Sequence, residues 1–199
     1  DAVLDSVTVD GQQYAYPFYL EPGGMLIYRT DLFEQVGLDP ATPPTTWDDL
    51  IAAGEALKAT GLVPFQTAET AVELSWTTWG QQVNAAGHLP IDDDWATSLA
   101  DDPAYAQLFQ LYQDLYAKGI VAEQSLSSYG DISPLGQGQV AMAANGSWAV
   151  SVLLNDYPDL VDDLALAPLP SFDGDQTKPT TTLGGWALGI DAKAADPAA

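Results

Sequence analysis

The chain has 199 residues, of which 47% are hydrophobic and 17% are charged, and its net charge is −23. This length can bury roughly 70% of the unfolded surface, and the composition is typical of an ordered globular protein. Five basic residues stand against 28 acidic ones, and such a surface repels phosphate groups, which argues against nucleic acid and anionic membranes as partners. The acids are spread along the chain, which favours a highly solvated surface. A saline habitat, whose salt would screen the self-repulsion, is left open.

Two further absences narrow the function classes. The sequence has no cysteine, which excludes disulfides, thiolate metal sites and cysteine nucleophiles. It has no apolar run of about 18 residues, the length needed to span a membrane. Residues Asp1–Asp10 show neither a basic n-region nor an apolar h-region, so no signal peptide is expected within the chain, as would also hold for a mature or trimmed protein.

The first part of the chain predicts extended structure followed by a short helix. Two short strands are expected on either side of a turn at Asp10–Gly11. Met25–Arg29 follows a cluster of glycine and proline and is predicted to be a buried strand. We expect Thr30 to cap a helix over 31–36, with Asp31 near its positive end.

Three longer helices are expected in the middle of the chain. Thr46 and Asp49 have the spacing of a capping box, which predicts a helix from about residue 47 to 60. A second helix is expected over 71–86. The strongest pattern begins at Asp102–Pro103, with aspartate as N-cap and proline in the first turn.

The segment Gly138–Val150 predicts a buried strand, a turn and the start of another helix. Its apolar run ends at Asn145–Gly146, and Asn145 or Ser147 is expected to cap a helix that begins at Trp148. Strand-to-helix junctions are where α/β proteins usually bind ligands. From this segment alone, Trp148 is either a platform that stacks on a sugar or an anchor of the core.

Further strands are expected at Leu164–Ala167 and Leu183–Ile190, the latter with Gly184–Gly185 before Trp186. Helices and short buried strands therefore alternate, which predicts an α/β fold.

Catalytic groups are scarce. The single histidine, His88, lies beside a predicted helix end, and no nucleophile elbow, P-loop or dinucleotide-binding fingerprint is present. Residues 92–94 and 173–175 contain aspartates without the ligand spacing of a calcium loop, so solvated acidic loops are favoured. We therefore expect no catalytic residue, no metal and no cofactor. A glycosidase cannot be inferred from carboxylates, since 28 acids guarantee chance pairs.

The aromatic residues are more informative. A pyranose packs its C–H face on an aromatic ring and needs carboxylate or amide partners for its hydroxyls, so an acidic, tryptophan-rich surface suits neutral sugars. Trp76, Trp79, Trp148 and Trp186 lie at element ends or on one helix stripe. For Trp76 and Trp79 a buried stripe is the favoured alternative. For Trp186, the preceding glycines allow a close backbone approach, which favours ligand contact.

Taken together, the motifs resemble those of extracellular sugar-binding proteins of ABC importers, the class that includes maltose-binding protein. Five motifs carry the resemblance in the family's order: Tyr14–Glu21 with Leu26–Phe33, Pro44–Leu50, Asn84–Gly87, Gly138–Ala149, and Ala167–Pro170 with Gly184–Leu188.

The resemblance implies a two-lobed, periplasmic-binding-protein-like α/β protein, with a mixed sheet flanked by helices, that closes around its ligand. It implies no enzyme but a monomer that binds a mono- or oligosaccharide, partners an ABC permease, and is an extracellular, cell-surface lipoprotein or periplasmic protein. The residues implied to bind substrate are Tyr19, Glu21, Trp76, Trp79, Trp148, Gly184, Gly185 and Trp186.

Family members are much longer, so the chain looks like a fragment that covers the second lobe and the hinge strands. Residues 1–22 would be hinge-side strands belonging partly to the first lobe, 23–168 the second lobe, and 169–199 the hinge crossover and returning strand. The alternatives are a carbohydrate-active hydrolase, a binding protein for a solute other than sugar, and a pure interaction module.

Overall fold

The computed structural model describes residues 2–67, 79–127, 130–175, 177–191 and 193–194. They form two compact units, one made of Asp1–Pro22 with Leu183–Ala199 and the other of Gly23–Thr182. Among the helices of the described residues, none is both long enough and apolar enough to cross a membrane.

The smaller unit consists of two antiparallel ribbons and one helical turn. Its elements are α1 (Ala2–Asp5), β1 (Thr8–Val9), β2 (Gln12–Gln13), β3 (Ala15–Pro22) and β8 (Leu183–Gly189). The β1–β2 turn has positive φ at both Asp10 (51°) and Gly11 (77°), the backbone that a two-residue hairpin needs. Strand β3 pairs with β8, with a register shift between Pro17 and Tyr19.

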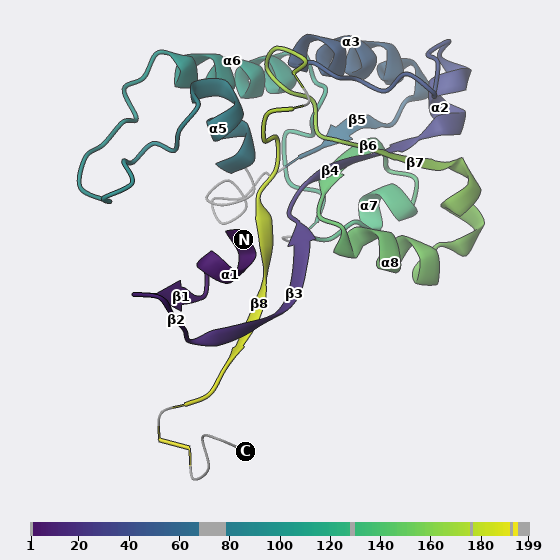
Figure 1. Ribbon diagram of the computed structural model, residues 1–199. Helices are drawn as coiled ribbons and strands as arrows, with labels where there is room; N and C mark the ends of the chain where they lie inside the picture. The colour runs from purple at the N-terminus through teal and green to yellow at the C-terminus, as the bar shows by residue number, and fades with distance from the viewer. Residues whose placement is uncertain (1, 68–78, 128–129, 176, 192, 195–199) are drawn as a thin grey trace. The chain divides into compact units, whose positions relative to one another are not determined.

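The larger unit is a sheet with helices on both sides (Figure 1). Its strands are β4 (Met25–Arg29), β5 (Val63–Gln66), β6 (Val140–Asn145) and β7 (Leu164–Ala167). Its helices are α2 (Thr30–Gln35), α3 (Trp47–Leu57), η1 (Lys58–Thr60), α5 (Trp79–Ala86), α6 (Ala104–Ala117), α7 (Ser133–Gly136), α8 (Trp148–Asp156) and η2 (Pro158–Asp163).

The sheet of the larger unit is mixed, in the strand order β5-β6-β4-β7. Strands β5 and β6 are parallel, whereas β4 is antiparallel to both β6 and β7. The carboxyl ends of β5 and β6 therefore meet at one edge of the sheet. This mixed sheet between helices confirms the α/β class expected from the sequence.

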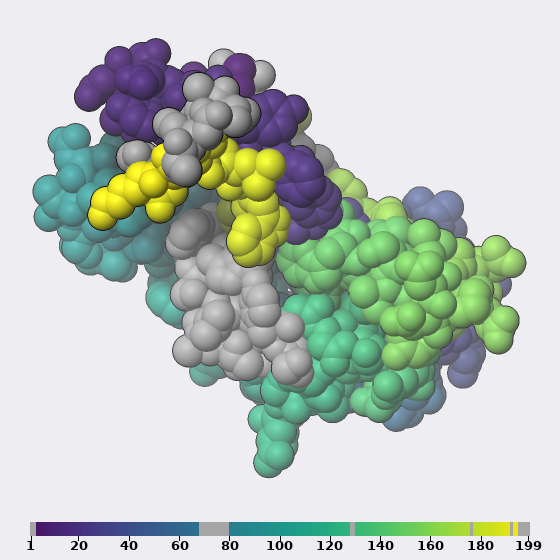
Figure 2. All heavy atoms as spheres, turned by 90° about the horizontal axis from the view of Figure 1, so that it is seen from below, coloured from purple at the N-terminus to yellow at the C-terminus, as the bar shows by residue number. Residues whose placement is uncertain are grey.

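Each face of the sheet has its own apolar core. One core joins Leu26 and Met142 of the sheet to side chains of α3 and α6, whereas the other joins Ile27 and Val140 to side chains of α7 and α8. Helices α3 and α6 accordingly lie on one side of the sheet and α7 and α8 on the other (Figure 1). In the space-filling view, the residues of α7, α8 and η2 form one continuous green surface (Figure 2).

Two helix starts show how far local sequence determines the structure. The capping box is present: Thr46 Oγ1 accepts from Asp49 N at 3.0 Å, and Asp49 Oδ2 accepts from Thr46 N at 3.0 Å. The expected cap at Thr30 is wrong, because Thr30 is the first helical residue and the preceding Arg29 provides no side-chain cap. Instead, the carboxylate of Asp31 accepts from Arg29 Nε at 2.7 Å.

Candidate functional site

The candidate site in the larger unit lies where β5 and β6 end. Gln66 is the last residue of β5 and Asn145 is the last residue of β6, and both side chains are buried. Asn145 Oδ1 accepts from the N–H of Gly146 at 2.8 Å, which stabilises the turn after the strand. Trp148 then begins α8, as expected, although the preceding Ser147 makes no side-chain cap hydrogen bond.

Trp148 is half-buried and held in a defined orientation. Its indole Nε1 donates to the backbone oxygen of Gly130 at 3.2 Å. Its six-membered ring lies against Gly146, where a Cβ would come within 1.8 Å of the ring. Trp148 also packs against the core on the α8 side of the sheet. The residue is thus anchored on one side while part of its surface stays accessible, and the two roles weighed for it from the sequence do not exclude each other.

Gln66 is a site residue that the sequence reasoning missed. Its Nε2 donates to Ser127 Oγ at 3.0 Å and to the Asp131 carbonyl at 3.3 Å. Its Oε1 is buried and has no hydrogen-bond partner among the described residues. The sequence offers one signal for it: Gln66 is a polar residue at the end of the otherwise apolar strand 63–66. This amide ties β5 to the same segment that accepts the Trp148 indole hydrogen bond at Gly130.

The ribbon of the smaller unit brings together several of the other predicted site residues. Tyr19 on β3 is directly opposite Trp186 on β8, and Glu21 is opposite Gly184. Tyr19 and Trp186 are 44% and 73% exposed. The hydroxyl of Tyr19 donates to Glu21 Oε2 at 2.7 Å. Because alternate residues of a strand share a face, two aromatic rings and a carboxylate lie on one side of this ribbon.

The two glycines before Trp186 have different roles. A Cβ at Gly185 would lie 2.1 Å from the backbone oxygen of Tyr19, so only glycine allows the two strands to approach this closely. A Cβ at Gly184 would meet nothing within 4 Å, so the strand contact does not require glycine at this position.

The remaining expectations concern a helix and catalytic chemistry. Trp79 begins helix α5, whereas Trp76 lies outside the described residues. Within the described parts of the chain, no group of three or more histidine, aspartate and glutamate side chains could hold a metal ion. The ring of His88 is hydrogen-bonded to the Leu89 carbonyl at 2.8 Å and to Asp102 at 3.1 Å, a contact within the segment that connects α5 to α6.

Comparison with known proteins gives the family. The family described as "Bacterial extracellular solute-binding protein" matches residues 1–199, the whole chain. This agrees with the expected binding protein rather than enzyme, and with the expected extracellular or periplasmic location.

Individual relatives agree with this assignment. A protein of Deinococcus radiodurans named "Probable ABC transporter-binding protein" is 29% identical over 98% of this chain and 47% of its own length. The sn-glycerol-3-phosphate-binding periplasmic protein UgpB of Agrobacterium fabrum is 34% identical over 39% of this chain and 16% of its own.

Among solved structures, maltose-bound MalE3 of T. maritima is 27% identical with a TM-score of 0.81, covering 96% of this chain and 48% of its own. The chain thus spans about half the length of the proteins it matches over most of its own length. The match of the family along the whole sequence and the shared fold lead to one conclusion: this chain belongs to the bacterial extracellular solute-binding proteins.

Proposed function

We propose that the chain forms a sugar-binding lobe of a solute-binding protein that delivers its ligand to an ABC permease. The observation that carries this proposal is Trp148: an oriented, half-buried indole at the carboxyl ends of two parallel strands. In this position an aromatic ring can pack against the C–H face of a pyranose. The anchor at Gly130 fixes the ring before the ligand arrives, which lowers the entropy cost of binding.

The same role, contact with the sugar, is proposed for residues of the β3–β8 ribbon. Trp186 and Tyr19 provide exposed aromatic surface, and Glu21 provides a carboxylate for hydroxyl groups. A carboxylate that accepts from a hydroxyl makes a stronger hydrogen bond than a neutral acceptor does. For Trp76 and Trp79 a ligand contact stays a prediction from the resemblance.

We further propose that β3 and β8 are hinge arms. The two strands run into the larger unit at neighbouring points, since Gly23 N donates to the Thr182 carbonyl at 2.7 Å. The ribbon exposes large apolar side chains, including Tyr16 at 66% and Phe18 at 67%. Related proteins have about twice the length of this chain, and a first lobe packed on the ribbon would cover such surface. In this reading the protein is a monomer that closes around one ligand.

A glycerophosphate is the second candidate ligand, because UgpB of Agrobacterium fabrum is named for sn-glycerol-3-phosphate. Phosphate is usually held by arginine, lysine or clustered backbone N–H groups. None of the site residues described above is basic, and the described side chains of Arg29, Lys58 and Lys178 form ion pairs with acids of their own segments. The chemistry of the described site residues therefore favours a neutral sugar.

The test is a calorimetric titration of the protein with mono- and oligosaccharides, and with sn-glycerol-3-phosphate in parallel. We expect saturable binding of at least one neutral saccharide and no binding of the phosphate ester. Binding of sn-glycerol-3-phosphate with no response to any sugar would overturn the choice of ligand class.

A further inference from the structure

A hollow of about 230 Å³ lies between α3 and α6, on the face of the sheet opposite to α8. It is therefore separate from Trp148, which begins α8 (Figure 1). This volume is below the usual range for drug-sized ligands, about 300–1,000 Å³, and corresponds to a small molecule. The aromatic and polar part of its lining consists of Trp47, Asp48, Gln107, Gln110, Asp114 and Phe172.

The aromatic wall of this hollow is fixed by hydrogen bonds from distant parts of the chain. Trp47 N donates to the Ser171 carbonyl at 3.1 Å, which joins the start of α3 to the segment that carries Phe172. Phe172 N donates to Asn84 Oδ1 at 2.8 Å, which joins it to α5. The backbone of Phe172 is thus held from two sides, while its side chain is 43% exposed.

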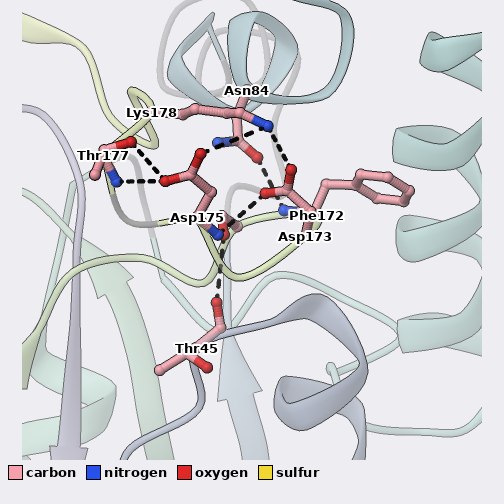
Figure 3. Close-up of polar contacts among 8 residues, drawn as sticks. Thr45, Asn84, Phe172, Asp173, Asp175, Thr177 and Lys178 are labelled. Carbon is pink, nitrogen blue, oxygen red and sulfur yellow. Dashed lines mark hydrogen bonds and ion pairs between the residues drawn. The ribbon is translucent and has the colours of Figure 1, made fainter.

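The loop after Phe172 is held together by ion pairs among its own residues. Lys178 forms ion pairs with Asp173 and, at 3.8 Å, with Asp175, and the N–H of Thr177 donates to Asp175 Oδ1 at 3.0 Å. The ring of Phe172 points away from these polar contacts (Figure 3). Asp173 and Asp175 are therefore paired with Lys178 of the same loop. Phe172, at the start of the loop, lines the hollow.

Trp47 supplies the second ring of the aromatic wall. It is 5% exposed and meets Phe172 edge to face, with ring centroids 5.4 Å apart and an interplanar angle of 69°. Its indole N–H has no partner among the described residues. The indole nitrogen is itself buried, with less than 1 Å² of accessible surface, so the N–H senses the surroundings of the ring rather than bonding a ligand in the hollow.

The polar lining identifies the class of ligand. Asp48 and Asp114 offer carboxylate acceptors, while the amides of Gln107 and Gln110 offer donors and acceptors. Gln110 Nε2 already donates to Asp114 Oδ1 at 2.8 Å, which orders this side of the rim. A guanidinium or ammonium group would satisfy the carboxylates but offers no acceptor to the amide N–H groups of the two glutamines. Hydroxyl groups both donate and accept, and a ring of C–H groups packs on Phe172.

We propose that this hollow is a second binding site, for a single sugar ring or cyclic polyol, on the α3–α6 face of the larger unit. It stands independently of the Trp148 site, because it uses other residues on the other side of the sheet. Phe172 and Trp47 provide the apolar contact, and the carboxylates and amides of α3 and α6 bind the hydroxyl groups.

The test follows the indole N–H of Trp47 by ¹H–¹⁵N NMR, with its cross-peak assigned by its loss in Trp47→Phe. The probes are methyl α-D-glucopyranoside and myo-inositol, and N-acetyl-L-arginine amide serves as the cationic comparison. We expect a saturable shift of this cross-peak with at least one of the two polyols. No saturable shift up to the solubility of both polyols, or tighter binding of the arginine derivative, would overturn the proposal.

Variants distinguish this site from the Trp148 site. Phe172→Ala and Asp114→Asn are expected to weaken polyol binding about two- to tenfold, the range that aromatic contacts and charged hydrogen bonds give. Phe109→Ala, a 69% exposed ring on α6 outside the hollow, should leave the binding unchanged. Trp148→Leu should leave the polyol-induced shift of the Trp47 cross-peak unchanged, even if it abolishes binding at the Trp148 site. Equal binding by Phe172→Ala and the wild type, or loss of the Trp47 response in Trp148→Leu, would contradict an independent second site.

Discussion

The six-membered ring of Trp148 lies so close to Gly146 that a Cβ added there would come within 1.8 Å of ring carbon Cζ3. The three heavy atoms nearest to that Cβ position all belong to this ring. The glycine of the turn is therefore required by the orientation of the tryptophan, and the two residues form one structural unit at the end of β6.

Gly146→Ala is expected to destabilise the protein by about 1–3 kcal/mol, because the added methyl group forces the indole out of its place. Urea unfolding followed by circular dichroism measures the change. The control is the same substitution in a Trp148→Ala background, where the clash is absent and the cost of Gly146→Ala should disappear. An equal cost in both backgrounds would show that the ring contact is not its cause.

Gly185 and Gly184 offer a matched pair within one strand. Gly185→Ala places a methyl group 2.1 Å from the Tyr19 carbonyl oxygen, whereas Gly184→Ala points into open space. We expect Gly185→Ala to speed amide hydrogen exchange along β3 and β8 by about tenfold or more, since separating the strands costs at least about 1.4 kcal/mol. Gly184→Ala should change exchange little. Similar exchange in both variants would contradict the close approach at Gly185.

His88 predicts a defined pH dependence of stability. The hydrogen bond to the Leu89 carbonyl, together with the contact to Asp102, raises the pKa of His88 above its ordinary value of about 6.5. The N–H of Ala104 and the contact with His88 hold the pKa of Asp102 below its ordinary value. The ring of Tyr105 meets the ring of His88 in a T-shaped contact, with centroids 5.8 Å apart. Protonated His88 can donate from both ring nitrogens, which neutral imidazole cannot.

The sign of this effect follows from linkage. A raised pKa of His88 contributes stability that is fully present below about pH 6.5 and is lost as the pH rises through the folded-state value. The lowered pKa of Asp102 contributes stability above about pH 4 that is lost on further acidification. The difference in unfolding free energy between wild type and His88→Gln should therefore be largest between about pH 4 and 6.5. Urea unfolding across this range measures it, and a difference that grows above pH 7 would contradict the assignment.

Local parts of the fold could be predicted from the sequence because their determinants are a few residues apart. The capping box of Thr46 and Asp49 is present as expected, and so is the turn at Asp10–Gly11. The cap expected at Thr30 is absent because the helix begins one residue earlier, with Thr30 inside it. The neighbouring ion pair of Asp31 with Arg29 is a contact that residue preferences alone do not reveal.

The candidate site could be predicted only in part, for a physical reason. The place of Trp148 follows from the order of strand, turn and helix. Its hydrogen bond to Gly130 and the bonds from Gln66 to Ser127 and Asp131 join residues 18, 61 and 65 positions apart. Such contacts depend on how the sheet brings distant segments together, and no local pattern specifies them.

The most direct test of the account replaces Trp148 and measures saccharide affinity by calorimetry. Trp148→Phe keeps an aromatic face, whereas Trp148→Leu keeps only apolar bulk, and both lose the hydrogen bond to Gly130. If the indole stacks on a sugar, Trp148→Phe should bind the best saccharide within about threefold of wild type. Trp148→Leu should bind it about tenfold more weakly than wild type, a loss of about 1.4 kcal/mol. Trp95→Leu, a 74% exposed tryptophan of the acidic loop, serves as the control and should bind as the wild type does. Equal affinity of Trp148→Leu and wild type would contradict the account.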